Sequence, residues 1–188
     1  RKDRKANAPE PERDSKTLAE FLKFRPKEEE LTLFSEFCLS FWKTFVEQLD
    51  DVQKYLSNDS EQPALGFRNK ETGGNLLFRP VGLLPVIQTA IEIHKRRKWD
   101  FGYILDLFDS IDFTISSKPW RNVVWNPHEK TMIMGSTGLV KLLLFYMLGQ
   151  DLIRPFELRN LKEKYADRLG IDEIESVLDD LPLVEYNE

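Results

Sequence analysis

The feature that most constrains this fold is a long run of mostly apolar side chains at helical spacing. Three acidic residues, Glu28 to Glu30, open the segment and favour a helix start through the helix dipole. Behind them, residues recur at alternating intervals of three and four, which places them on one helix face. The pattern predicts a single helix of about eight turns over residues 28–56. Its members are Leu31, Phe34, Cys38, Phe41, Phe45, Gln48, Val52 and Tyr55.

A second set of apolar residues widens this face. It comprises Phe37, Trp42, Val46 and Leu49. A helix that is apolar on more than one side is contacted on more than one side. Because a chain of 188 residues has limited means of covering both sides, we expect apolar surface near Trp42 or Leu49 to remain exposed. Such surface marks an interface, so helix 28–56 is the predicted contact for a protein partner or a homo-oligomer.

The rest of the chain predicts shorter elements, so the expected fold class is mainly α: a multi-helix domain with one or two short β-strands. Residues 61–74 contain Gly66, Gly73 and Gly74 and predict a loop. Val123–Trp125 and Thr131–Met134 predict strands around an Asn126-Pro127 turn, and Asn75–Phe78 is a further candidate strand. Six further helices are predicted. The first is capped by Ser15 or Thr17 and ends at Phe24, the second has Pro85 in its first turn and ends at residues 94–98, and the third covers Tyr103–Phe108. The fourth covers Leu139–Leu148 with Ser136 or Thr137 as its cap, the fifth runs from Pro155 to Leu169, and the last runs from an Asp172–Glu175 capping box to Leu178.

One of these segments is expected to be central. Leu139–Leu148 is apolar nearly all round, and such a helix is normally buried on every side. Residues 1–14 are polar, contain two prolines and lack periodicity, which is typical of a disordered or linker arm. Residues 15–188 are then expected to form a single helical domain. Because the chain begins with Arg1 and not Met, we expect it to be a fragment of a longer protein or a chain that lacks its natural start.

Composition limits the chemistry that this chain can perform. The single cysteine, Cys38, cannot form an intrachain disulfide and fits a reducing compartment, so we expect a cytoplasmic protein. No apolar run approaches the roughly 20 residues that span a bilayer, and no membrane partner is expected. His94 and His128 lie far apart in sequence, and no zinc spacing or phosphate-binding loop is present. We therefore expect no metal, no cofactor and no catalytic residues.

The charge of the chain is unevenly distributed. The net charge is −5, yet residues 67–99 hold seven basic and two acidic groups, a local excess of +5. Four of these bases are consecutive at a predicted helix end: Lys95, Arg96, Arg97 and Lys98. We interpret them as a patch that contacts DNA phosphates, with Arg79 as a possible neighbour. The alternative is that the four bases only complement the helix C-terminus and aid solubility.

Two segments resemble a known family. They are GGNLLFRPVG at residues 73–82 and PWRNVVWNPHEKTMIM at residues 119–134, the latter followed by a helix that ends LLLFYMLG at residues 142–149. This arrangement resembles the C-terminal part of bacterial DGQHR-domain proteins, the DndB-like proteins associated with DNA phosphorothioate modification. The resemblance covers roughly residues 73–150. The naming motif Asp-Gly-Gln-His-Arg and its ParB/sulfiredoxin-like core are absent, so within this family that core would precede Arg1.

The resemblance implies a bacterial DNA-modification or phage-defence context and a role in DNA binding or transcription regulation. The leading hypothesis is therefore a non-catalytic helical accessory domain that binds DNA or a partner. The alternative is a protein–protein interaction or oligomerisation domain with no DNA contact. A third is an enzyme whose site is completed by upstream residues. Surface clustering of Arg79 with Lys95–Lys98 would favour the accessory domain over the interaction domain that has no DNA contact.

Overall fold

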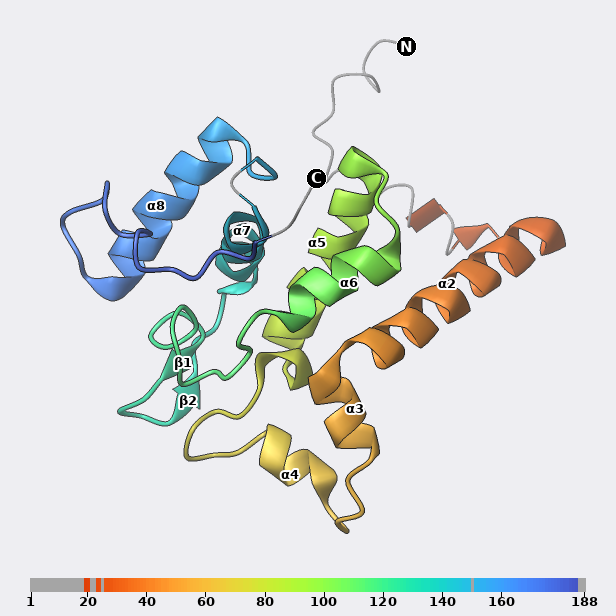
Figure 1. Ribbon diagram of the computed structural model, residues 1–188, viewed down its shortest axis with the longest axis horizontal. Coiled ribbons are helices and arrows are strands. Elements are labelled where there is room, and N and C mark those ends of the chain that lie inside the picture. Colours follow the sequence, from red (N-terminus) through yellow and green to blue (C-terminus); the bar gives the residue numbers. More distant parts are fainter. Residues whose placement is uncertain (1–18, 21–22, 25, 150, 186–188) are drawn as a thin grey trace. The chain divides into compact units, whose positions relative to one another are not determined.

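The computed structural model describes residues 19–20, 23–24, 26–149 and 151–185 (Figure 1). The chain forms two compact units, residues 1–42 and residues 43–188, which we describe separately. The predicted arm at residues 1–14 lies outside the described residues. Of the predicted helix ending at Phe24, residues 19, 20 and 23 are helical and its proposed caps lie outside the described residues.

The described residues confirm a mainly α fold with one small sheet. The helices account for most of the described chain, and the two strands are antiparallel, pairing Trp125 with Met132 and Asn126 with Thr131. The elements are α2 (Glu28–Gln48), α3 (Asp50–Leu56), α4 (Pro63–Phe67), the 3₁₀ helix η1 (Leu76–Phe78), α5 (Pro80–Arg97), α6 (Phe101–Asp109), β1 (Trp125–Asn126), β2 (Thr131–Met132), α7 (Thr137–Leu148) and α8 (Pro155–Leu169).

The predicted helix over residues 28–56 is broken into two. Leu49 adopts an extended backbone, with φ −92° and ψ 109°, and its side chain is fully buried. The amide of Asp50 then donates to a carboxylate oxygen of Asp109 at 2.8 Å, which supplies a partner for the first turn of α3. Because that partner is 59 residues away, the apolar spacing gives no sign of the break, and the prediction of one continuous helix is wrong at Leu49.

The segment between α3 and α5 also differs from prediction. The predicted loop contains the short helix α4, with Pro63 in its first turn. The candidate strand at residues 75–78 is wrong, because only Asn75 pairs as a β-bridge, with Thr114. The side-chain oxygen of Asn75 accepts from the amide of Leu77 at 2.9 Å and so starts η1.

Helix α5 starts earlier than predicted. Pro80 occupies its first turn, so Pro85 lies inside the helix and is buried; the assignment of Pro85 to the first turn is wrong. The helix ends at Arg97, and Lys98 follows in the left-handed conformation with φ 61°. In the larger unit α5 packs against η1, α6 and α7, and α8 packs on α7, so that α7 lies between α5 and α8 (Figure 1).

Helix α7 is the predicted central helix. Eight of its twelve residues are buried, including Leu143, Leu144 and Phe145. Its capping differs from prediction: Ser136 precedes the helix with φ −87° and ψ −6°, not the extended backbone of an N-cap, and makes no cap bond. Its buried hydroxyl instead donates to the carbonyls of Val123 and Ile133, at 2.6 and 3.2 Å. Ser136 thus ties α7 to the hairpin segment.

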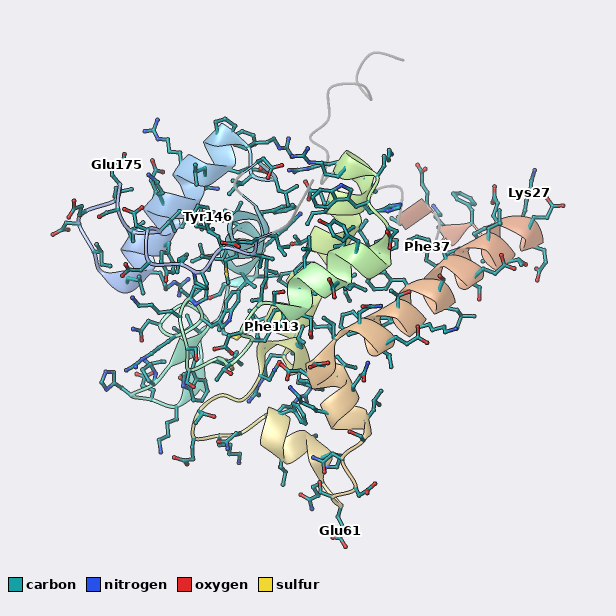
Figure 2. All side chains as sticks on the ribbon, in the orientation of Figure 1. Lys27, Phe37, Glu61, Phe113, Tyr146 and Glu175 are labelled. Carbon is teal, nitrogen blue, oxygen red and sulfur yellow. The ribbon has the colours of Figure 1, made fainter. Side chains whose placement is uncertain are left out.

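Aromatic packing supports the loop between α6 and β1. Trp120 is fully buried, and its indole N–H donates to the Asp112 carbonyl at 2.6 Å. Its ring stacks on Phe113 with centroids 6.3 Å apart; Figure 2 shows Phe113 within the larger unit. The two predicted strands are confirmed, although each has only two residues.

The chain after α8 does not form the predicted final helix. Residues 175–180 make successive turns instead, with Leu181 N–H donating to Leu178 O at 3.0 Å. The proposed capping box is also wrong, because the Glu175 carboxylate binds the Lys162 ammonium at 2.7 Å. Glu175 is labelled in Figure 2. The hydroxyl of Tyr146, also labelled in Figure 2, donates to Leu178 O at 3.4 Å and anchors these turns to α7.

Candidate functional site

Within the described residues, nothing resembles a catalytic centre. No group of three or more His, Cys, Asp or Glu side chains there is placed to hold a metal ion. The two best-defined hollows are shallow, one of about 150 Å³ beside Met147 and Val184 and one of about 470 Å³ along α8. Burial, with a smaller contribution from Asp180, raises the pKa of Tyr165 to about 12.

None of the described helices combines the length and the apolar character that crossing a bilayer requires.

Arg79 is the most isolated member of the predicted patch. It lies immediately before α5, is half-buried, and donates from Nε and Nη2 to the carbonyl of Gly73 at 3.2 and 2.9 Å. Burial and, second, the neighbouring Arg68 lower its pKa. The other four bases lie at the opposite end of α5, which at 18 residues is about 27 Å long. The structure therefore does not bring Arg79 together with Lys95–Lys98.

Arg96 is an internal structural residue. Its guanidinium pairs with Glu92 one turn earlier and lies 3.7 Å from Glu157. Nη1 donates to the carbonyl of Leu152 at 2.7 Å, and the guanidinium lies over the ring of Phe145. Only 24% of its side chain is exposed. Little of Arg96 remains available to a phosphate.

Glu92 is the centre of an ionic cluster that joins three helices. Besides Arg96, it pairs with Lys141 of α7 at 2.6 Å and with Arg154 at 3.5 Å, immediately before α8. Arg154 also lies 3.3 Å from Glu157, which closes the set. We call these five residues the Glu92 network: Glu92, Arg96, Lys141, Arg154 and Glu157. With three cations and two carboxylates, it leaves one positive charge in excess.

Arg97 is paired as well. Its guanidinium forms an ion pair with Asp151 and lies 5.9 Å from the ring centroid of Trp99. It also reaches the Asp151 carbonyl at 3.5 Å. Arg96 and Arg97 thus both hold the connection between α7 and α8 against the end of α5.

Lys95 and Lys98 differ from the two arginines between them. Both are exposed, and neither forms an ion pair with another residue in the described part of the chain. Of the four consecutive bases, these two combine exposure with the lack of an ion pair among the described residues, whereas Arg97 is exposed but held by Asp151. The basic edge that faces solvent is therefore narrower than the charge count implies.

The apolar surface predicted on the long helix is present. Leu39 is 68% exposed and Trp42 is 44% exposed, whereas Leu49 is fully buried. The expectation of exposed apolar surface near Trp42 or Leu49 is therefore confirmed near Trp42, while Leu49 closes the break between α2 and α3. Leu33 is 67% exposed and lies on yet another side of α2.

Sequence reasoning missed the contributions of Lys141 and Arg154. Lys141 is the one charged residue in an otherwise apolar helix, and Arg154 directly precedes Pro155, the first residue of α8. A lone charge in an apolar helix marks the side of the helix that faces away from the core. In α7 this signal identifies the side that meets Glu92.

Searches with protein-family models, among curated proteins and among solved structures found nothing that matches the chain.

Proposed function

We propose that this chain is a non-catalytic helical accessory domain that contacts another protein through α2. The observation that carries the proposal is the exposure of large apolar side chains on that helix, 68% at Leu39 and 44% at Trp42. Apolar side chains gathered on one exposed helix are typical of a binding surface, because leaving them in water forgoes about 1.5–3 kcal/mol for each one that a partner could bury. Under this proposal the described surfaces bind and do not perform chemistry.

The setting we propose follows the resemblance of residues 73–82 and 119–149 to DGQHR-domain proteins. In that setting the domain serves a bacterial DNA-modification or phage-defence protein as a regulatory or DNA-linked accessory part. The interaction role of α2 does not depend on this setting. A protein contact through α2 and a DNA contact elsewhere are compatible, because they use different residues.

Photo-crosslinking in the host cell tests the protein contact. A photoreactive phenylalanine analogue replaces Leu39, and the matched control carries it at the exposed Lys164 of α8. We expect covalent protein adducts from position 39 that are absent from position 164. If position 39 gives no adduct above the level of position 164, α2 is not a protein-binding surface.

DNA contact is the second candidate, favoured by the exposed pair Lys95 and Lys98. Two phosphate contacts predict a dependence of log K on log salt with a slope of about −1.8, against about −3.6 for four contacts. We expect weak binding without sequence preference, because phosphate contacts position a protein but do not read bases. Fluorescence anisotropy with a short duplex at low salt measures both the affinity and the slope.

The matched variants separate these lysines from their neighbours. Changing Lys95 and Lys98 together to Ala is expected to abolish the salt-dependent binding, whereas Lys130→Ala in the hairpin is expected to leave it unchanged. Absence of binding by the unmodified chain at low salt contradicts the DNA candidate. Binding that survives the double substitution places the DNA surface elsewhere.

A further inference from the structure

Helix α2 carries a second helical stripe beside the buried one. Thr32, Ser35, Leu39, Trp42 and Val46 recur at intervals of three, four, three and four residues. This is the a/d spacing of a coiled-coil seam, with Leu39 and Val46 at a and Trp42 at d. The stripe from Leu31 to Phe45 has the same spacing but is rotated around the helix. It is buried at its C-terminal end, where Phe41 and Phe45 are only 6% and 4% exposed, whereas Phe34 is 53% exposed.

The middle of this second stripe faces solvent. Leu39 is 68% exposed, and Trp42 is 44% exposed while it contacts Phe41 edge-on, with ring centroids 5.8 Å apart. Val46 is half-buried one turn further along. All these residues lie on one continuous helix, so their relative positions follow from helix geometry. We call Leu39, Trp42 and Val46 the α2 seam.

Two opposite charges flank the α2 seam on the same side. Glu36 and Lys43 each follow a d position, which makes both of them e residues of the repeat. Among the described residues, the ion-pair contact of Lys43 is a loose one within its own helix, 3.9 Å to Glu47, between two well-exposed side chains. The g positions are Leu31, Cys38 and Phe45, which offer no partner for either charge.

The position of these charges selects one pairing geometry. In parallel coiled coils g residues pair with e residues of the other helix, so Glu36 and Lys43 would find no opposite charge. In an antiparallel pair the e flank of one helix meets the e flank of the other. Glu36 of one copy then lies beside Lys43 of the second, and the two-fold axis repeats the same pair.

We infer that α2 pairs antiparallel with α2 of a second copy of this chain. In the register that joins Glu36 to Lys43 of the second copy, Leu39 packs on Trp42 of the second copy and Val46 lies against its Ser35. The inference rests on the proposed function, since it names the partner of α2. The seam is short, so the buried area falls below the ~1,200 Å² of stable interfaces and the dimer is weak and concentration-dependent.

Charge exchange tests this pairing without disturbing the core, because Glu36 and Lys43 are both exposed. Sedimentation equilibrium compares the unmodified chain with E36K, K43E and the double variant. Each single variant turns two attractions into two repulsions, which is expected to weaken dimerisation about tenfold. The double variant restores the unmodified affinity, and an equimolar mixture of the two single variants associates better than either one alone.

The opposite results overturn the inference. A chain that stays monomeric up to millimolar concentration does not pair through α2. A double variant as weak as the single ones, or a mixture no better than its components, excludes this antiparallel register. Leu39→Glu is expected to abolish the dimer. Leu33→Glu, on another side of the same helix and equally exposed, is the control and is expected to leave the dimer intact. Equal effects of the two substitutions would exclude the α2 seam as the dimer contact.

The two proposals fail in different ways. Adducts from position 39 to a different protein, with a monomeric chain in the centrifuge, overturn self-pairing and leave the proposed function standing. Absence of any adduct from position 39 overturns the proposed function itself. A dimeric chain whose position 39 crosslinks to a second copy supports both.

Discussion

The guanidinium carbon of Arg96 lies 4.9 Å from the ring centroid of Phe145, which joins the end of α5 to the middle of α7. Arg96, one of four consecutive bases, is thereby held against the core of the fold. The same ring also receives Lys141, whose ammonium lies 5.8 Å from the centroid. Phe145 is therefore covered by two cations that both pair with Glu92.

Removal of Arg96 is expected to destabilise the domain. Arg96→Ala leaves the half-buried Glu92 with one close cation fewer and frees the carbonyl of Leu152. Hydrogen bonds to charged groups and partly buried pairs suggest a loss of about 1–3 kcal/mol in the free energy of unfolding. Urea denaturation measures it. The control is Lys95→Ala, a substitution of the exposed neighbour, which is expected to change the free energy of unfolding by less than about 0.5 kcal/mol. Equal losses of stability in the two variants would show that Arg96 behaves as a surface residue.

Acid is expected to weaken the Glu92 network. Burial works to raise the pKa of Glu92, but Lys141 and Arg96 outweigh it, so the pKa lies below its ordinary value of 4.5. A carboxylate with a lowered folded-state pKa adds stability above its unfolded pKa and loses that stability as the pH falls through the folded one. Glu92→Gln should therefore be less stable than the unmodified chain at neutral pH, and the difference should shrink below about pH 4.

Thermal unfolding at a series of pH values measures this difference. Glu173→Gln, an exposed carboxylate after α8, is the matched control and is expected to follow the unmodified chain throughout. A Glu92→Gln variant whose deficit stays constant from neutral pH into acid would mean that the charge of Glu92 does not stabilise the fold.

The spacing of apolar residues predicted those helices whose own side chains determine which of their sides is buried. Leu139–Leu148 reads as a central helix because almost every side chain in it is apolar, and α7 is buried as expected. The stripe from Leu31 to Phe45 likewise reads as a helix, since its spacing matches α2. These signals are local, so one sequence suffices to read them.

What sequence could not predict depends on distant partners. The break at Leu49 relies on Asp109, and the side chain of Glu175 binds Lys162 in place of a cap. The candidate DNA patch failed to cluster for the same reason. Charge counting treats four bases as equal, whereas the fold pairs Arg96 and Arg97 with acidic residues of other elements and leaves Lys95 and Lys98 exposed.

Two helical glycines are expected to respond oppositely to Ala. A Cβ on Gly82 in α5 would lie 2.2 Å from Leu76 Cγ and 2.3 Å from its carbonyl oxygen, so α5 and η1 would have to separate. Gly82→Ala should cost about 1–3 kcal/mol. A Cβ on Gly138 in α7 meets nothing within 4 Å, so Gly138→Ala should gain up to about 1 kcal/mol through helix preference. Guanidinium denaturation of both variants checks the sign, and a stabilised Gly82→Ala protein would disprove the close approach.

The strongest test of the core compares two neighbouring leucines of α7. Leu143 is fully buried, whereas its neighbour Leu142 is half-buried. Leu143→Ala leaves a cavity that close-packed neighbours fill only in part, so the expected loss is about 2–5 kcal/mol. Leu142→Ala removes the same atoms from a site that water already reaches, and its loss should be clearly smaller. Denaturant unfolding gives both values under one set of conditions. A loss below about 1 kcal/mol at Leu143 would show that α7 is peripheral, because deletion of a core leucine is felt throughout a packed interior.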